Sequence, residues 1–215
     1  MQQYAIIVAG GKGLRMGGET PKQFIPLGDK PVIVHTIEQF LQYDQFIKII
    51  VVLPENHIAT WLEIKENHFP KIKIQHAVGG EQRFDSVKSG ISLIKGDEGL
   101  VAIHDAVRPF VSQNTIKDSF VSANKYGSGV ASVPLKDSIR ELKKKGESKS
   151  RNRANFRLVQ TPQTFRVNEI KMAFAQATNS QHTDDASVYE DAGYDVRLVE
   201  GTYGNIKITT PEDLK

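Results

Sequence analysis

Tyr4-Ala5-Ile6-Ile7-Val8, followed directly by Ala9-Gly10-Gly11-Lys12-Gly13-Leu14-Arg15-Met16-Gly17, opens the chain with a short apolar strand and a glycine-rich turn. Glycines have no Cβ, so backbone N–H groups in such a turn can approach phosphate oxygens closely. Three cations (Lys12, Arg15 and Lys22) lie within eleven positions of one another. The stretch therefore predicts a strand that ends in a phosphate-binding loop.

Two better-known phosphate loops do not fit this turn. A P-loop requires Ser or Thr after its Gly-Lys pair, and here Lys12 is followed by Gly13. The dinucleotide-binding fingerprint requires glycine or alanine where Met16 stands, and an acidic residue at the end of the second strand, where Leu53-Pro54 lies. A plain glycine turn remains open as an interpretation, but it does not explain the three cations.

Apolar runs of strand length alternate with helical patterns along most of the chain. This alternation predicts a three-layer α/β fold, with a mostly parallel, Rossmann-like sheet covered by helices on both faces. We expect one domain over residues 1–215, because the chain shows no internal repeat and no second core. The expected strands are 4–8, 46–53, 72–77, 100–104, 129–133, 195–200 and 205–209, and the expected helices are 31–43, 55–67, 82–95, 113–126, 167–179 and 183–192, with Gly193 ending the last and another helix beginning near Thr210.

Residues 135–160 interrupt this pattern with a polar and basic segment. From Lys136 to Arg157 there are nine basic and three acidic residues, a net charge of +6 that leaves −3 on the remainder of the chain. Such a composition cannot fill a core, so we expect a protruding β-arm of two strands with a loose tip near 143–150. We expect no nucleic-acid partner, because Phe156 is the only aromatic residue between Lys136 and Arg157 that could stack on a base.

Composition excludes several kinds of site and location. The chain contains no cysteine, which excludes disulfides, thiolate metal sites and a cysteine nucleophile and suits a reducing compartment. Its longest apolar stretch, Ile49 to Leu53, is far below the ~20 residues that cross a bilayer. The N-terminus carries no pattern of an export signal. We therefore expect a soluble, cytoplasmic protein without a membrane partner.

Several further motifs follow the opening loop in a fixed order, and together they resemble those of the sugar-phosphate nucleotidyltransferases. Within that superfamily the chain is most similar to the cytidylyltransferases that act on 2-C-methyl-D-erythritol 4-phosphate, in non-mevalonate isoprenoid synthesis. The segments that carry the resemblance are Ala9–Met16, Pro21–Gln23, Gly79–Arg83 with Ser86, His104–Pro109, Thr161–Gln163, Thr183–Ser187 and Asn205–Lys207.

The resemblance implies transfer of CMP from CTP to methylerythritol phosphate, with release of pyrophosphate and formation of 4-diphosphocytidyl-2-C-methyl-D-erythritol. It assigns Arg15, Lys22 and Lys207 to the α-phosphorus as catalytic cations. Phosphoryl transfer depends on charge neutralisation and in-line positioning, which suits a site dominated by cations. The residues that the resemblance assigns to nucleotide binding are Ala9, Gly10, Gly11, Lys12, Gly13, Gly80, Arg83 and Ser86.

On the acceptor side the resemblance implies Asp105, Ser138, Arg153 and Thr183. Asp105 ends an expected strand, where open α/β sheets place ligands, and its carboxylate could also contact Mg²⁺ or another divalent cation, which the reaction is expected to need. The family arginine that Arg153 matches acts in the neighbouring subunit's site, which implies a homodimer formed through the arm.

Purely structural interpretations, without a part in catalysis or binding, remain open for several of these residues. Thr183 could simply cap the helix expected at 183–192. Asp105 could cap a helix or pair with Arg108, which could hold its own loop rather than touch substrate. His104 is expected to be a packed strand residue and not a base, and none of the histidines has metal-ligand spacing.

Other functions also remain open. The ribitol-5-phosphate cytidylyltransferases share the opening loop and the His-Asp-Ala-Val-Arg-Pro motif, although Thr183–Ser187 and the start of the arm at Lys136–Ile139 favour methylerythritol phosphate. A molybdenum-cofactor-type guanylyltransferase shares only the opening loop. A nucleotide-binding module without turnover is the alternative of a different class, and the joint presence of Arg15, Lys22, Asp105 and Lys207 speaks against it.

Overall fold

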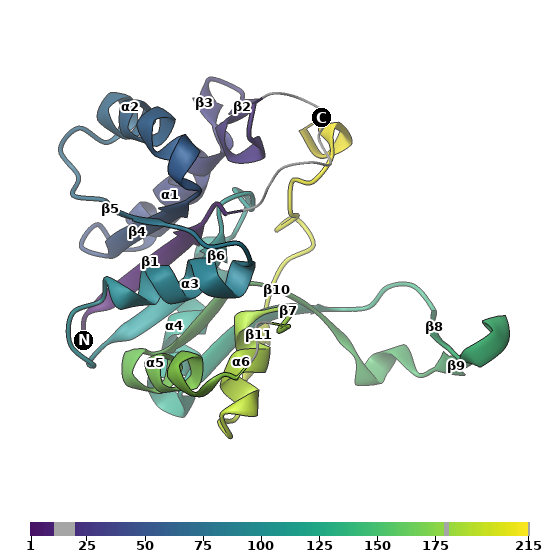
Figure 1. The fold of residues 1–215 in the computed structure, drawn as a ribbon. Helices are drawn as coiled ribbons and strands as arrows, with labels where there is room; N and C mark the ends of the chain where they lie inside the picture. Colours follow the sequence, from purple (N-terminus) through teal and green to yellow (C-terminus); the bar gives the residue numbers. More distant parts are fainter. Residues whose placement is uncertain (11–19, 179–180, 215) are drawn as a thin grey trace.

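The computed structural model describes residues 1–10, 20–178 and 181–214. A seven-stranded sheet in the order β11-β7-β10-β6-β1-β4-β5 forms the centre of the molecule (Figure 1). Neighbouring strands are parallel except where β10 pairs with β6 and with β7. The predicted mostly parallel sheet is thus confirmed. Its strands are β1 (Gln3–Val8), β4 (Lys48–Leu53), β5 (Gln75–Val78), β6 (Leu100–Asp105), β7 (Ser128–Pro134), β10 (Arg157–Arg166) and β11 (Leu198–Glu200).

Helices cover both faces of the sheet, as the alternating pattern predicted. On β1, Ala5 and Ile7 point into one hydrophobic cluster, and Ile6 points into the other, because successive side chains of a strand face opposite sides. The first cluster includes residues of α1 (Val32–Tyr43), α2 (Ile58–His68) and α4 (Gln113–Tyr126). The second includes residues of α3 (Arg83–Ser92), α5 (Val167–Gln176) and α6 (Asp185–Asp191). A small ribbon of β2 (Pro26–Leu27) and β3 (Lys30–Pro31) precedes α1.

Two assignments from the sequence were wrong. Residues 205–209 form no strand, although Ile208 N donates to Val107 O, in the loop after β6, at 2.9 Å. The antiparallel strand β10 was missed, because its middle is polar and carries Pro162, which cannot donate to a ladder. Its pairing with β7 shifts register between Val159 and Gln163.

The ends of the last helices agree better with the sequence. Gly193 follows α6 with φ +88°, the left-handed backbone of a residue that ends a helix. A single 3₁₀ turn, Pro211–Leu214, stands where a new helix was expected. The carboxylate of Asp213 accepts from the backbone N–H groups of Thr209 (2.8 Å) and Thr210 (2.9 Å), and the bond to Thr210 is one half of a capping box.

The basic segment between β7 and β10 is an arm that projects away from the sheet (Figure 1). It contains the antiparallel strands β8 (Ile139–Leu142) and β9 (Ser148–Arg151), as predicted. Its tip is shorter than expected, because Lys143 N already donates to Glu147 O at 2.8 Å. Among the helices of the described residues, none has the length and apolar character needed to cross a membrane.

The carboxyl ends of the parallel strands meet at one edge of the sheet. Val8 of β1 lies opposite Val52 of β4 and Asp105 of β6, and Leu53 lies opposite Val78 of β5. The loops that follow these strands therefore begin side by side. In an open α/β sheet this edge is where ligands bind.

Candidate active site

The opening loop begins at this edge of the sheet, but most of it lies outside the described residues. Gly11, Lys12, Gly13 and Arg15 all fall in the 11–19 gap, so their predicted roles stay predictions. Ala9 is held on both sides, since its N–H donates to Val52 O (2.8 Å) and its carbonyl accepts from Gln23 Nε2 (3.2 Å). The start of the loop is therefore fixed between β4 and the Pro21–Gln23 motif.

Ser86 lies between the start of the opening loop at Gly10 and the second predicted nucleotide loop at Gly79–Gly80. Its buried Oγ accepts from Gly80 N (3.2 Å) and donates to Gln82 O (3.1 Å). A Cβ on Gly10 or on Gly79 would lie 2.8 Å from the same oxygen, so both positions require glycine for the two loops to close around Ser86. The structure thus brings Gly10, Gly80 and Ser86 together, and their role in nucleotide binding stays a prediction.

Arg83, which the sequence assigned to the nucleotide, turns towards α6 instead. Its Nη1 and Nη2 donate to the two carboxylate oxygens of Asp185 at 2.7 and 2.6 Å, a bidentate pair. Its Nε lies 3.6 Å from Oδ1 of Asp105. Asp185 is 1% exposed, and the two carboxylates raise the pKa of Arg83 against the opposing effect of its burial. Arg83 therefore acts as a link between two buried carboxylates.

Asp105, at the end of β6, forms ion pairs with three cations. Besides Arg83, the Lys207 ammonium lies 2.9 Å and the Arg108 Nε 3.4 Å from its Oδ2. Burial would raise the pKa of the Asp105 carboxyl, but the charges of Arg83, Lys207 and Arg108 outweigh burial and hold the pKa well below its usual value. Asp105 is therefore shared by three cations, of which Arg83 is also paired with Asp185.

His104, one residue earlier, is not a base in this arrangement. The imidazole is fully buried, packs edge-on against Phe40 and contacts the Arg108 carbonyl through Nε2 at 3.1 Å. Burial lowers the pKa of His104 to about 4, so the ring is neutral near pH 7. The prediction of a packed strand residue is confirmed.

The segment after Asn205 carries Lys207 to Asp105. Arg108 Nη1 donates to Asn205 O (2.7 Å), and Asn205 Nδ2 donates to Thr161 O (2.8 Å). Lys22 contacts the same segment from another part of the chain, since its Nζ donates to Thr209 O at 3.3 Å. The structure therefore brings Lys22 and Lys207 to one short stretch, although they are far apart in sequence.

A closed ring of contacts fixes this side of the site. Asp105 N donates to Thr161 Oγ1 (3.1 Å), Thr161 O accepts from Asn205, Asn205 O accepts from Arg108, and Arg108 returns to the Asp105 carboxylate. Thr161 and Asn205 stood in motifs quoted from the sequence, but sequence reasoning gave neither of them a role. The only signal in the sequence was that polar side chains in buried segments must find hydrogen-bond partners.

The acceptor residues of the sequence prediction are less closely assembled. Thr183 is exposed, and the α6 cap is Asp184, whose Oδ1 accepts from Ser187 N at 3.0 Å. The interpretation of Thr183 as the helix cap was therefore wrong. Ser138 and Arg153 are exposed on the arm, where Arg153 donates to the Lys136 carbonyl. The arm leads away from the sheet (Figure 1), whereas Asp105 lies at the end of the sheet strand β6.

Comparison with known proteins decides the family. The family model described as 2-C-methyl-D-erythritol 4-phosphate cytidylyltransferase (IspD) matches residues 3–215. The chain belongs to this family. Proteins of that name from Phocaeicola vulgatus and Bacteroides fragilis are 46% identical over 215 residues and 49% identical over 216 residues, and each match covers 100% of this chain and 97% of the relative. The crystal structure of 4-diphosphocytidyl-2C-methyl-D-erythritol synthase from Anaerococcus prevotii superposes with a TM-score of 0.85 at 27% identity, over 99% of this chain and 94% of that one.

Membership of the IspD family confirms the predicted enzyme class, a cytidylyltransferase, and the predicted reaction is that of the family. It favours the methylerythritol branch over the ribitol and guanylyl alternatives. It also speaks against a nucleotide-binding module without turnover.

Asp105 is poorly placed to bind a divalent cation, although the sequence analysis considered it as a possible metal ligand. Three cations already surround the carboxylate, and a metal ion would have to displace at least one of them. Within the described ranges, no group of three or more His, Cys, Asp or Glu side chains could hold a metal. Asp105 is better suited to organising Lys207 and Arg83 than to binding a metal ion.

Proposed function

We propose that this chain performs the IspD reaction at the sheet edge that carries Asp105, with Lys207 as its central cation. The observation that carries the proposal is that Lys207 is half exposed and paired at 2.9 Å with a buried carboxylate, while Lys22 binds the same segment. Such an ammonium is held in place and yet open to an incoming phosphate.

The chemistry requires no strong base. A phosphate oxygen of the acceptor attacks the α-phosphorus of CTP, and a new P–O bond forms while the bond to the bridging oxygen breaks. Pyrophosphate leaves with that bonding pair. Because the attacking group is already an anion, the obstacle is repulsion between two polyphosphorylated partners. A neutral, buried His104 agrees with a mechanism that relies on cations rather than on proton transfer.

Lys22, Lys207 and Arg15 supply the opposing charge. One cation ~4 Å from a phosphate charge is worth about 4 kcal/mol at an effective dielectric of 20, before desolvation is subtracted. When the triphosphate arrives, the Lys207 ammonium can turn from the Asp105 carboxylate to a phosphate oxygen. The released carboxylate oxygen can then accept a hydrogen bond from a hydroxyl group of the acceptor. Asp105 thus serves both substrates in turn.

The nucleotide occupies the loops that begin at Ala9, with Gly10 to Gly13 and Lys12 around the phosphates. The backbone near Gly80 and Ser86 borders the base, since Ser86 draws that loop against Gly10. Arg83 supports this loop from behind and does not read the base, because both of its terminal nitrogens are engaged by Asp185.

The acceptor lies between Asp105 and Thr183, and Ser138 and Arg153 of a neighbouring subunit complete its site. This arrangement makes the enzyme a homodimer through the arm. Magnesium, or another divalent cation, would add positive charge beside the triphosphate, and Asp105 would not be its ligand. We also place the enzyme in the cytoplasm, which a chain without cysteine suits. The partners are CTP and a polyol phosphate, without nucleic acid or membrane.

A grid of four nucleoside triphosphates against methylerythritol phosphate and ribitol phosphate tests the proposal, with pyrophosphate release as the measurement. We expect turnover with CTP and methylerythritol phosphate, and at least about 100-fold lower kcat/KM for every other pair, which corresponds to a difference of about 3 kcal/mol between transition states. Equal rates with ribitol phosphate would refute the acceptor. Pyrophosphate release that does not depend on any acceptor would refute the transfer itself.

A further inference from the structure

Gln163 stood in a motif of the sequence, Thr161-Pro162-Gln163, to which no function has been assigned so far. It lies on β10 and is 1% exposed. Its Nε2 donates to Asp184 Oδ2 at 2.9 Å, and its Oε1 accepts from Ala186 N at 2.8 Å. Both ends of one buried amide are thus engaged with the first turn of α6.

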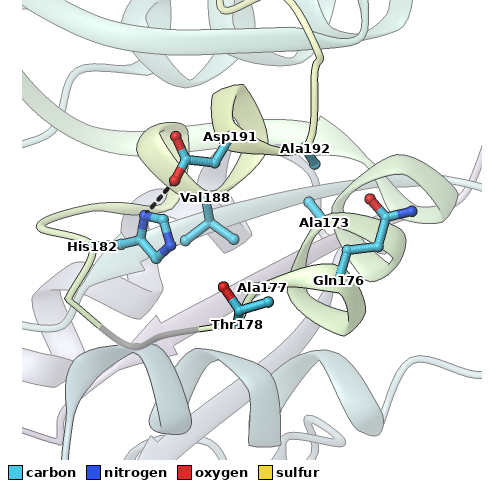
Figure 2. A pocket seen from close by; sticks show the side chains of 8 residues that line it. All are labelled: Ala173, Gln176, Ala177, Thr178, His182, Val188, Asp191 and Ala192. Atoms are coloured by element: carbon cyan, nitrogen blue, oxygen red, sulfur yellow. Dashed lines mark ion pairs between the residues drawn. The ribbon is translucent and has the colours of Figure 1, made fainter.

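Packing holds the middle of this helix, since Val188 and Tyr189 are 2% and 1% exposed in the hydrophobic core. Helix α6 has seven residues, and a hollow of about 320 Å³ separates part of it from α5 (Figure 2). Val188 and Asp191 line the hollow on the α6 side, and Ala173 and Gln176 line it on the α5 side. The contacts to Gln163 add to this packing at the start of the helix, where Asp184 is only partly buried and Thr183 is exposed.

The same turn leads to the centre of the site. Asp185 follows Asp184 and binds Arg83 in the bidentate pair, and Arg83 Nε lies 3.6 Å from Asp105. Thr183 precedes Asp184 directly. A shift of this turn would move Thr183 and loosen the support of Asp105 from Arg83.

We propose that Gln163 is a positioning residue for the acceptor: its amide clamps the first turn of α6, so that Thr183 is held opposite Asp105. Gln163 does not touch the substrate in this arrangement. The inference rests on the proposed function in one respect, namely the contact between Thr183 and the acceptor.

A reversal of the hydrogen bond between Gln163 and Asp184 tests the clamp. In Gln163→Glu two carboxylates face each other, and in Asp184→Asn two amide NH₂ groups face each other. In the double variant Gln163→Glu/Asp184→Asn the new amide donates to the new carboxylate, while the bonds to Ala186 N and Ser187 N keep their acceptors. Gln176→Glu makes the same chemical change at an exposed position across the hollow and serves as the control.

We expect the KM for methylerythritol phosphate to rise about tenfold in each single variant and to return to within about threefold of the wild-type value in the double variant. The KM for CTP should change less than about twofold throughout. Gln176→Glu should leave both constants unchanged. Equal losses for both substrates, or no recovery in a folded double variant, would overturn the proposal, because a general loss of structure would not discriminate between substrates.

Amide hydrogen exchange of residues 184–188 measures the clamp without any substrate. We expect faster exchange in both single variants and recovery in the double variant. Unchanged exchange would overturn the clamp even if turnover were normal. Should the wild-type protein show no turnover with CTP and methylerythritol phosphate, the proposed function fails, while the exchange experiment still decides whether Gln163 fixes the turn.

Discussion

At the scale of single residues, one buried carboxylate organises the site. Asp105 is 7% exposed and has three cationic partners from three parts of the chain. A buried charge is stable only when it is paired and hydrogen-bonded. Asp105 meets this condition and at the same time holds Lys207 where a phosphate would need it. Stability and function are therefore coupled at this residue.

Replacement of Asp105 by Asn should destabilise the fold by about 2 kcal/mol at pH 7, because three cations lose their shared counter-charge. The loss should shrink with acid. The cations hold the folded-state pKa of Asp105 below its unfolded value, so its charge stabilises the fold above about pH 4 and less so as the pH falls towards the folded pKa. Urea unfolding of the wild type and the variant at pH 7 and at about pH 3.5 measures the difference.

Asp97→Asn provides the control for this experiment. Asp97 also forms an ion pair, at 3.1 Å with Lys171, but its side chain is 77% exposed. Exposed pairs of this kind contribute less than about 1 kcal/mol. A loss in Asp105→Asn that is no larger than in Asp97→Asn, or that does not vary with pH, would contradict the central place given to this carboxylate.

The sequence predicted the cations and the pair of Asp105 with Arg108, but not their other partners. Lys22, Arg108 and Lys207 stood out because each lies in a recognisable motif. The bond between Arg83 and Asp185 joins residues 102 positions apart, and no spacing rule connects them. Arg83 was assigned to the nucleotide by the family resemblance alone, because its place beside Gly79 and Gly80 does not reveal a buried ion pair. Only the tertiary fold distinguishes the two.

At the scale of elements, the polar strand β10 determines how the site is assembled. Gln160, Thr161 and Gln163 are all buried in its middle, and they bind Asn205, Asp105 and the start of α6. Sequence patterns predicted the apolar strands correctly, because apolar runs report burial directly. They missed β10, whose buried side chains are polar. They also assigned a strand to 205–209, where the buried Ile208 suggests sheet pairing but Asn205 makes the decisive bonds.

Thr161→Val should test this role of β10. Valine has the shape of threonine but leaves Asp105 N without its acceptor, which is 3.1 Å away in the wild type. We expect a loss of about 1–2 kcal/mol in the free energy of unfolding, since a buried N–H would go unpaired. Because that N–H belongs to Asp105, kcat/KM for pyrophosphate release should also fall. Urea unfolding and initial rates measure the two effects.

Thr164→Val is the matched control on the same strand. Thr164 Oγ1 is equally buried and donates to Ser119 Oγ at 2.8 Å, away from Asp105. This variant should lose comparable stability and keep its kcat/KM. If both variants lost activity in proportion to stability, β10 would be a general structural strand without a special part in the site.

At the scale of the whole molecule, the arm is the feature that one chain leaves unexplained. Apolar side chains stay exposed on it and at its base, including Leu142 (82%), Phe156 (44%) and Leu158 (52%). Tyr203, close to Lys207 in sequence, holds the base of the arm through a bond from its hydroxyl to Pro134 O (2.8 Å). Several large exposed apolar side chains on one segment are typical of a surface that another chain covers. Both observations agree with an arm that completes a neighbouring site.

Mixing two impaired variants, assayed at a methylerythritol phosphate concentration well below the KM of Arg153→Ala, tests whether the arm crosses between subunits. Lys22→Ala should lower kcat by at least about 100-fold, because the triphosphate loses a cation, and Arg153→Ala should mainly raise the KM for methylerythritol phosphate. In a two-fold dimer with crossed arms, a mixed dimer has one site with both substitutions and one with neither. After denaturation and joint refolding of equal amounts, about half of the dimers are mixed and one of their two sites is unsubstituted, so we expect about a quarter of all sites to be fully active. Activity that stays at the sum of the two separate variants would show that Arg153 acts within its own chain.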